Sequence, residues 1–155
     1  MFNHCVWYSI HKSHSLSKLI INLAKSFHTD LFHAHITVVS NKTYKEADHI
    51  YKHQCIIPKP WFRIHGRIYQ TKTHIGNNTF YAIQQDYYMY DIKNLGEYHV
   101  SLAYRINNPF TKEEIAYANG LVPVDTIWSN DFKVSLYDCR PSLPKNWKQL
   151  KVSVF

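Results

Sequence analysis

Residues 33–39 read HAHITVV, and a similar segment at residues 98–104 reads YHVSLAY. Each segment has a histidine followed two positions later by a hydroxyl residue, within an apolar run of the kind that forms strands. Because side chains alternate between the two faces of a strand, His35 shares a face with Thr37, and His99 shares a face with Ser101. The pattern predicts two strands that each bury one face in the core and turn a polar face elsewhere.

Matches of the form His-x-Ser or His-x-Thr are weak signals on their own, because the chain contains 11 histidines. A third match, His11-x-Ser13, lies at the edge of a polar stretch and has no alternating apolar face. Strand context therefore selects the other two. The alternative for these two is a structural role, in which both histidines satisfy hydrogen bonds inside the fold.

The two selected motifs suit chemistry on a phosphate ester. Histidine titrates near neutral pH and can act as general acid or base, and a small hydroxyl can donate to a phosphate oxygen. His35 and His99 are therefore the candidate catalytic residues, and Thr37 and Ser101 are the candidate phosphate-binding residues. The sequence leaves open which histidine is the acid and which is the base.

Composition indicates one folded domain spanning residues 1–155. Of the 155 residues, 45% are hydrophobic and 15% are aromatic, which excludes a disordered chain and allows a sizeable core. The net charge of +7 favours a phosphate-bearing partner such as a nucleotide or RNA, with simple solubility as the alternative. Three scattered cysteines without a Cys-x-x-Cys pair predict free thiols in a reducing compartment.

No apolar run approaches the roughly 18 residues that a membrane-spanning helix needs. The first residues also lack the basic and apolar regions of a secretory signal. We therefore expect a monomer in the cytoplasm or nucleus that is not secreted and has no membrane partner.

The pattern of apolar residues and caps predicts an α+β chain. We expect strands at residues 4–10, 31–39, 62–73, 79–87, around His99, at 132–138 and at 148–154. A helix capped by Ser13 or Ser15 should run to Phe27, and residues 74–78 should form a hairpin turn. Each histidine strand is followed by a Thr-x-x-Glu helix start, at residues 43–46 and 111–114. The chain thus divides into two loosely similar halves, and a pseudo-twofold arrangement would place their motifs across a shared cleft.

This combination resembles the 2H phosphoesterase superfamily, and in particular the small cyclic nucleotide phosphodiesterases of the plant and yeast type. The resemblance rests on the Val6-Trp7 pair, on residues 34–38 (AHITV), and on residues 99–104 (HVSLAY) followed by an acidic helix start. It implies a bilobal, LigT-like α+β fold. In that fold, two antiparallel sheets with flanking helices surround a central cleft lined by the two motifs.

The resemblance also implies an activity: hydrolysis of 2′,3′-cyclic nucleotides or related 2′-linked phosphodiesters such as ADP-ribose 1″,2″-cyclic phosphate, without a metal or other cofactor. For this branch it favours opening to the 2′-phosphate. An alternative within the superfamily is cleavage of 2′,5′-oligoadenylates or cyclic oligonucleotides that act as immune signals. An alternative of another class is a non-catalytic module that binds RNA or nucleotides, which the basic charge and tyrosine content fit equally well.

Further candidates surround the motifs. By the resemblance, Trp7 and Tyr104 could stack on a base, although alternation places Tyr104 on the face opposite His99 unless the strand bends. Alternation returns Arg105 to the His99 face, where it could hold a phosphate, and Arg63 and Arg67 are weaker candidates of the same kind.

Two patterns keep alternatives open. The cluster Tyr87-Tyr88-Met89-Tyr90 is either a platform for a base or a strand packed into the core. The spacing His33-x-His35 is also used by metal ligands, although no paired carboxylates or HExxH motif supplies a third ligand.

Overall fold

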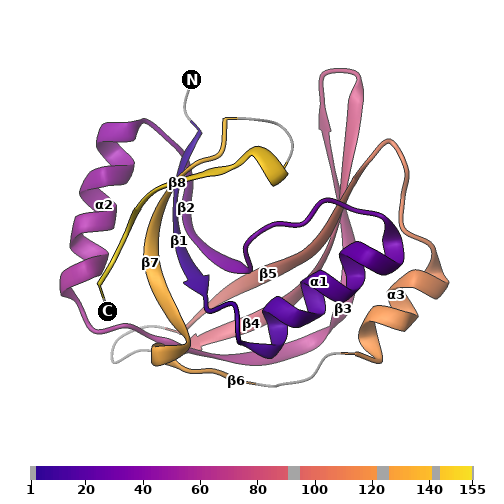
Figure 1. The fold of residues 1–155 in the computed structure, drawn as a ribbon, viewed down its shortest axis with the longest axis horizontal. Coiled ribbons are helices and arrows are strands. Elements are labelled where there is room, and N and C mark those ends of the chain that lie inside the picture. Colours follow the sequence, from indigo (N-terminus) through magenta and orange to yellow (C-terminus); the bar gives the residue numbers. More distant parts are fainter. Residues whose placement is uncertain (1–2, 91–94, 122–125, 141–143, 155) are drawn as a thin grey trace.

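The computed structural model describes residues 3–90, 95–121, 126–140 and 144–154 (Figure 1). In chain order its elements are β1 (His4–Ile10), α1 (Ser15–Phe27), β2 (His35–Lys42), α2 (Tyr44–Ile56), β3 (Trp61–Ile75), β4 (Asn78–Tyr90), β5 (Leu95–Ile106), α3 (Lys112–Asn119), β6 (Thr126–Ile127), η1 (Ser129–Asp131), β7 (Phe132–Asp138), η2 (Pro144–Asn146) and β8 (Lys148–Val152). The predicted α+β class is confirmed.

Local sequence signals account for most element boundaries. Thr43 and Thr111 each cap a helix in a reciprocal capping box with the glutamate three residues later. The β3–β4 hairpin turns at Gly76, whose φ of 61° lies in the left-handed region that glycine adopts readily. Helix α1 begins as expected, but its N-cap is His14, whose Nδ1 accepts from the Leu16 amide, rather than a serine.

The second strand begins at His35, so the predicted start at Leu31 is wrong. Phe32 and Ala34 are buried and continue the apolar alternation of the strand. Alternation reports burial, however, and a strand also needs a partner: upstream of His35 the chain makes one backbone contact to β1, from the Ile10 amide to the Ala34 carbonyl.

Hydrogen bonding joins the eight strands of the described residues into one antiparallel sheet of order β6-β3-β4-β5-β2-β1-β7-β8, where two sheets were expected. The pairing between β2 and β5, at the centre of the sheet, is short. Strands β4 and β5 pair from Phe80–Ile106 to Tyr90–Leu95, whereas β2 and β5 share the single pair Ile36–Val100. The sheet is therefore continuous, with its weakest connection at its centre.

The helices cover one face of this sheet. Helix α2 packs on β1, β2 and β7, while α1 packs on β5 and α3 packs on β3. In Figure 1, α2 lies along the left side, and α1 and α3 lie on the right. The buried apolar side chains of all three helices join one core cluster with Val6, Ile36, Val100 and Leu136. Residues that alternate with these core positions lie on the opposite face, which we call the site face because it carries His35, Thr37, His99 and Ser101.

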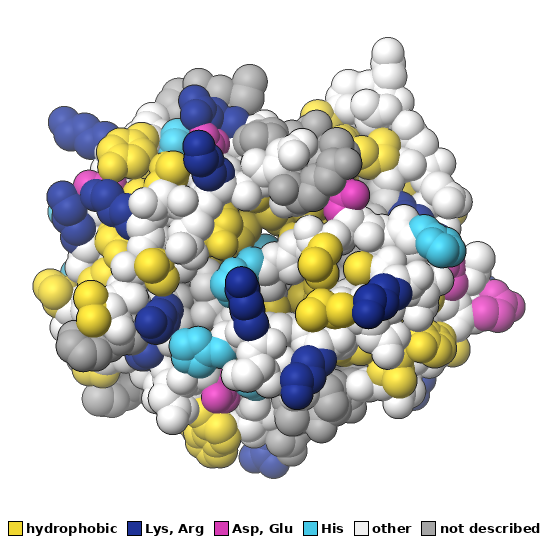
Figure 2. Space-filling view, viewed as in Figure 1, with side chains coloured by type: hydrophobic (Ala, Val, Ile, Leu, Met, Phe, Trp, Pro, Cys, Tyr) yellow, Lys and Arg dark blue, Asp and Glu magenta, His cyan; other side chains and the backbone are white. Residues whose placement is uncertain are grey.

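Among the described residues, no helix is long and apolar enough to cross a membrane. Lysine and arginine side chains are widely spread over the face of the molecule in Figure 2, in keeping with the net charge of +7.

Candidate active site

The two histidine motifs meet at the single residue pair that joins β2 to β5. Ile36 and Val100 are both fully buried and point into the core. In the antiparallel direction of this pair, His35 and Ser101 flank it at one end and Thr37 and His99 flank it at the other, all on the site face. The structure thus brings together four residues from distant parts of the chain.

His35 is held as a neutral ring. Its side chain is 5% exposed, and its Nδ1 lies 2.7 Å from the His33 carbonyl oxygen. A carbonyl oxygen only accepts, so Nδ1 carries the proton and Nε2 keeps its lone pair. Burial lowers the pKa of His35 to about 3, so the imidazole is uncharged at neutral pH.

Trp7 supports His35 from the neighbouring strand. Its ring stacks on the His35 ring with centroids 3.5 Å apart, and it also stacks on Tyr137 at 3.9 Å. Trp7 is 2% exposed and its ring lies against His35 and Tyr137, so it has no ring face open to a base. The base-stacking role that the resemblance implied for Trp7 is therefore contradicted. Trp147 borders the same cluster, with its ring 5.6 Å from Trp7. The structure therefore places Trp7 behind the candidate catalytic residue.

His99 has a different environment. It is exposed at the site face and lies directly across from Asp86 on β4. Partial burial lowers the pKa of His99, while the negative charge of Asp86 opposes this and raises it.

A chain of hydrogen bonds holds Asp86 in place. The Tyr69 hydroxyl donates to Asp86 Oδ1 at 2.9 Å and accepts from Gln84 Nε2 at 2.6 Å. Gln84 in turn lies across from Ser101, so this network links the two ends of the second motif. The sequence did not predict Tyr69, Gln84 and Asp86, because their meeting depends on the pairing register between β3, β4 and β5.

A bulge in β5 places Tyr104 on the site face. The register passes from Ile83–Ala103 to Gln84–Ser101, which leaves Leu102 as the extra residue. Simple alternation is broken there, so Tyr104 follows Ser101 on the same face. The two side chains are hydrogen bonded, and burial raises the pKa of Tyr104 to about 12, which keeps its hydroxyl protonated.

The same bulge moves Arg105 away from the site, and its predicted place on the His99 face is wrong. The Arg105 guanidinium makes a bidentate contact to Glu114 of α3, at 2.8 and 2.6 Å. Its Nη2 also donates to the Phe27 carbonyl at the end of α1, at 3.0 Å. Arg105 therefore ties two helices to the core side of the sheet.

The tyrosine cluster is divided between the two faces of β4. Tyr87 is fully buried and Met89 is largely buried, so these two belong to the core. Tyr88 and Tyr90 alternate with them and lie half-buried on the site face. Arg63, one of the weaker phosphate candidates, is exposed across from Tyr88.

His33 is engaged by the protein through both ring nitrogens. Its Nε2 lies 2.8 Å from the Ile10 carbonyl oxygen, and its Nδ1 lies 3.4 Å from the Tyr137 hydroxyl. These contacts direct the ring toward the protein and not toward a ligand shared with His35. Within the described part of the chain, no three His, Cys, Asp or Glu side chains are grouped as metal ligands.

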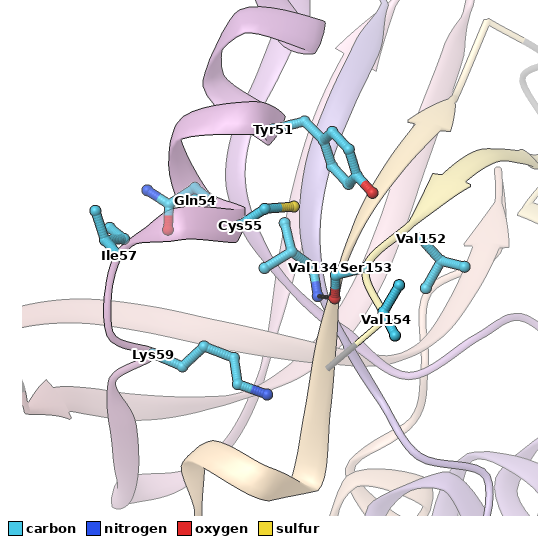
Figure 3. Close-up of a pocket in the computed structure, with 9 residues that line it drawn as sticks. All are labelled: Tyr51, Gln54, Cys55, Ile57, Lys59, Val134, Val152, Ser153 and Val154. Atoms are coloured by element: carbon cyan, nitrogen blue, oxygen red, sulfur yellow. Dashed lines mark hydrogen bonds between the residues drawn. The ribbon is translucent and has the colours of Figure 1, made fainter.

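A pocket of about 430 Å³ lies elsewhere, between α2 and strands β7 and β8. Figure 3 shows Tyr51, Cys55 and Lys59 on one side of it and Val134 and Val152 on the other. None of the four motif residues lines this pocket. It is therefore separate from the candidate active site.

No protein-family model matches the chain, and no curated protein matches it. The function therefore has to be inferred from the arrangement of its residues.

Proposed function

We propose that this chain is a phosphodiesterase that hydrolyses 2′,3′-cyclic nucleotides, or related 2′-linked phosphodiesters such as ADP-ribose 1″,2″-cyclic phosphate, without a metal ion. The observation that carries the proposal is the meeting of His35-x-Thr37 and His99-x-Ser101 across the Ile36–Val100 pair. Two titratable rings and two hydroxyl groups then face one space, which is the minimum set for acid–base chemistry on a phosphate.

The fold supports the same proposal. Strands β6, β3, β4 and β5 with helices α1 and α3 form one half, and strands β2, β1, β7 and β8 with helix α2 form the other. We propose that these halves are the two lobes of a 2H phosphoesterase. Each half then contributes one histidine motif from its innermost strand.

The environments of the two histidines suggest how they divide the reaction. His35 has a free Nε2 lone pair and accepts a proton from the attacking water, which forms a bond to phosphorus. Burial lowers the pKa of His99, and the carboxylate of Asp86 opposes this and favours the protonated ring. In that form His99 donates a proton to the ester oxygen of the cyclic phosphate that leaves as its bond to phosphorus breaks. Thr37 and Ser101 donate hydrogen bonds to the non-bridging oxygens, whose negative charge grows in the transition state.

The test is an assay of cyclic phosphate turnover in the wild type, His35→Ala and His99→Ala. The substrates are 2′,3′-cyclic mononucleotides, ADP-ribose cyclic phosphate, 2′,5′-oligoadenylate and cyclic dinucleotides, in the presence of a strong chelator. We expect each substitution to lower kcat by roughly 10²–10⁴-fold while substrate affinity is largely retained. The matched control is His49→Ala, which removes an exposed histidine on α2.

The outcomes separate the alternatives. Turnover confined to 2′,5′-oligoadenylate or cyclic dinucleotides would assign the chain to the signal-degrading alternative. Binding without turnover of any substrate would indicate a non-catalytic nucleotide-binding module. Full activity in either folded histidine variant would contradict the two-histidine mechanism, and loss of activity on chelation would contradict a metal-independent reaction.

A further inference from the structure

The site face of β3, β4 and β5 continues beyond His99 as a strip of polar and aromatic side chains. His65 and Asp86 lie in register with His99, and the next row on the same face is formed by Arg63, Tyr88 and Glu97. The strip ends at an aromatic stack, by which we mean Trp61, Tyr90 and Trp128.

The aromatic stack is ordered but open to solvent. Trp61 stacks on Tyr90 with ring centroids 4.4 Å apart and planes 14° apart, and on Trp128 at 5.4 Å and 27°. Trp128 follows the short strand β6, whose Ile127 pairs with Phe62, so it lies beside Trp61 on the site face. Trp128 nevertheless remains 55% exposed. A large exposed ring at the end of such a stack is typical of a binding surface.

We propose that the aromatic stack binds a base of a single-stranded oligonucleotide whose terminal phosphodiester occupies the space between His35 and His99. The row of Trp61 and Tyr90 lies four positions along β5 from the His99 row. This corresponds to about 13 Å along an extended strand. A base at the stack therefore belongs to a nucleotide further along the chain than the one that reacts.

Stacking rather than charge carries this interaction. Arg63 offers a positive charge between the stack and His99, but Glu97 lies 3.9 Å from His65 and Asp86 belongs to the His99 network. The strip is thus of mixed charge. Every base has a π face, so an aromatic platform binds single strands with little sequence preference, whereas bases in a duplex are already stacked.

This inference rests on the proposed function only for the orientation of the oligonucleotide, with its terminal phosphodiester at the two histidines. The first test measures binding and does not depend on catalysis. Binding of a fluorescein-labelled oligoribonucleotide of about six nucleotides is measured by fluorescence anisotropy for the wild type and Trp128→Ala. We expect the Kd to rise about tenfold in Trp128→Ala and to recover largely in Trp128→Phe. The control is Tyr117→Ala, which removes an exposed aromatic ring from α3 and should leave the Kd unchanged.

A second measurement connects the stack to turnover. For Trp128→Ala, kcat/KM should fall about tenfold for an oligonucleotide that ends in a 2′,3′-cyclic phosphate and stay unchanged for a cyclic mononucleotide. An absence of turnover with a stack-dependent Kd would refute the proposed function and leave the binding site intact. An equal Kd for the wild type and Trp128→Ala, with circular dichroism showing both folded, would overturn the binding site and assign the stack to another partner.

Discussion

The buried, neutral state of His35 has a measurable consequence for stability. The folded-state pKa of His35 is about 3, against an ordinary value of 6.5, because burial penalises the charged ring. The folded-state pKa is depressed, so the unfolded state binds more protons than the folded state between these values. The stabilisation is therefore complete above pH 6.5 and is lost as the pH falls toward 3.

The magnitude follows from this difference. Between pH 7.5 and pH 5 the unfolded chain gains a proton at His35 that the folded protein does not accept, which costs about 2 kcal/mol of stability. The substitution His35→Asn removes this pH-dependent contribution, whatever its effect on stability at neutral pH. Between pH 7.5 and pH 5, the free energy of unfolding should therefore fall by about 2 kcal/mol less in His35→Asn than in the wild type.

Urea unfolding at pH 7.5 and pH 5, followed by circular dichroism, measures the four free energies that this comparison needs. His14 and His99 also have lowered pKa values, mainly through burial, and they contribute equally to both proteins. The control His49→Asn should keep the wild-type dependence on pH. An identical loss of stability in the wild type and His35→Asn would refute the burial of a neutral ring at this position.

Three further predictions concern residues around the site. The substitution Asp86→Asn removes the charge that raises the pKa of His99, so an NMR titration should show the pKa of His99 falling relative to the wild type. The substitution Arg105→Met breaks the partly buried ion pair with Glu114 and should lower the free energy of unfolding by about 1–2 kcal/mol, with kcat/KM unchanged. The substitution Gly66→Ala places a Cβ at a φ of 71°, in open space, and should cost about 1 kcal/mol through backbone strain in urea unfolding.

Local features of the fold could be predicted because their causes are local. A threonine hydroxyl and a glutamate three residues later satisfy the first amides of a helix, and both such boxes are present at Thr43 and Thr111. Glycine supplies the left-handed turn residue of the β3–β4 hairpin. Each histidine motif was recognisable for the same reason, since alternation relates residues two positions apart.

The remaining features depend on which strands become neighbours. The partnership of Asp86 with His99 exists because β4 and β5 pair in one register, and a shift by one residue would turn Asp86 to the other face. The bulge at Leu102 exchanged the expected faces of Tyr104 and Arg105. Nothing in residues 99–105 alone distinguishes a bulged strand from a regular one.

The neighbouring strands give the two histidines different environments. An aromatic ring packs on His35, whereas a carboxylate lies near His99. Strand β1 places the ring of Trp7 against His35, so that apolar burial keeps that imidazole neutral. Strand β4 places the carboxylate of Asp86 beside His99, where it favours the protonated ring. Burial lowers the pKa of both rings, and only His99 has a nearby carboxylate that opposes this effect. In the proposed mechanism this difference assigns the base to His35 and the acid to His99. The single Ile36–Val100 pair joins the two halves of the sheet between the two motifs, so in the proposed mechanism each ring is positioned by the strands of its own half.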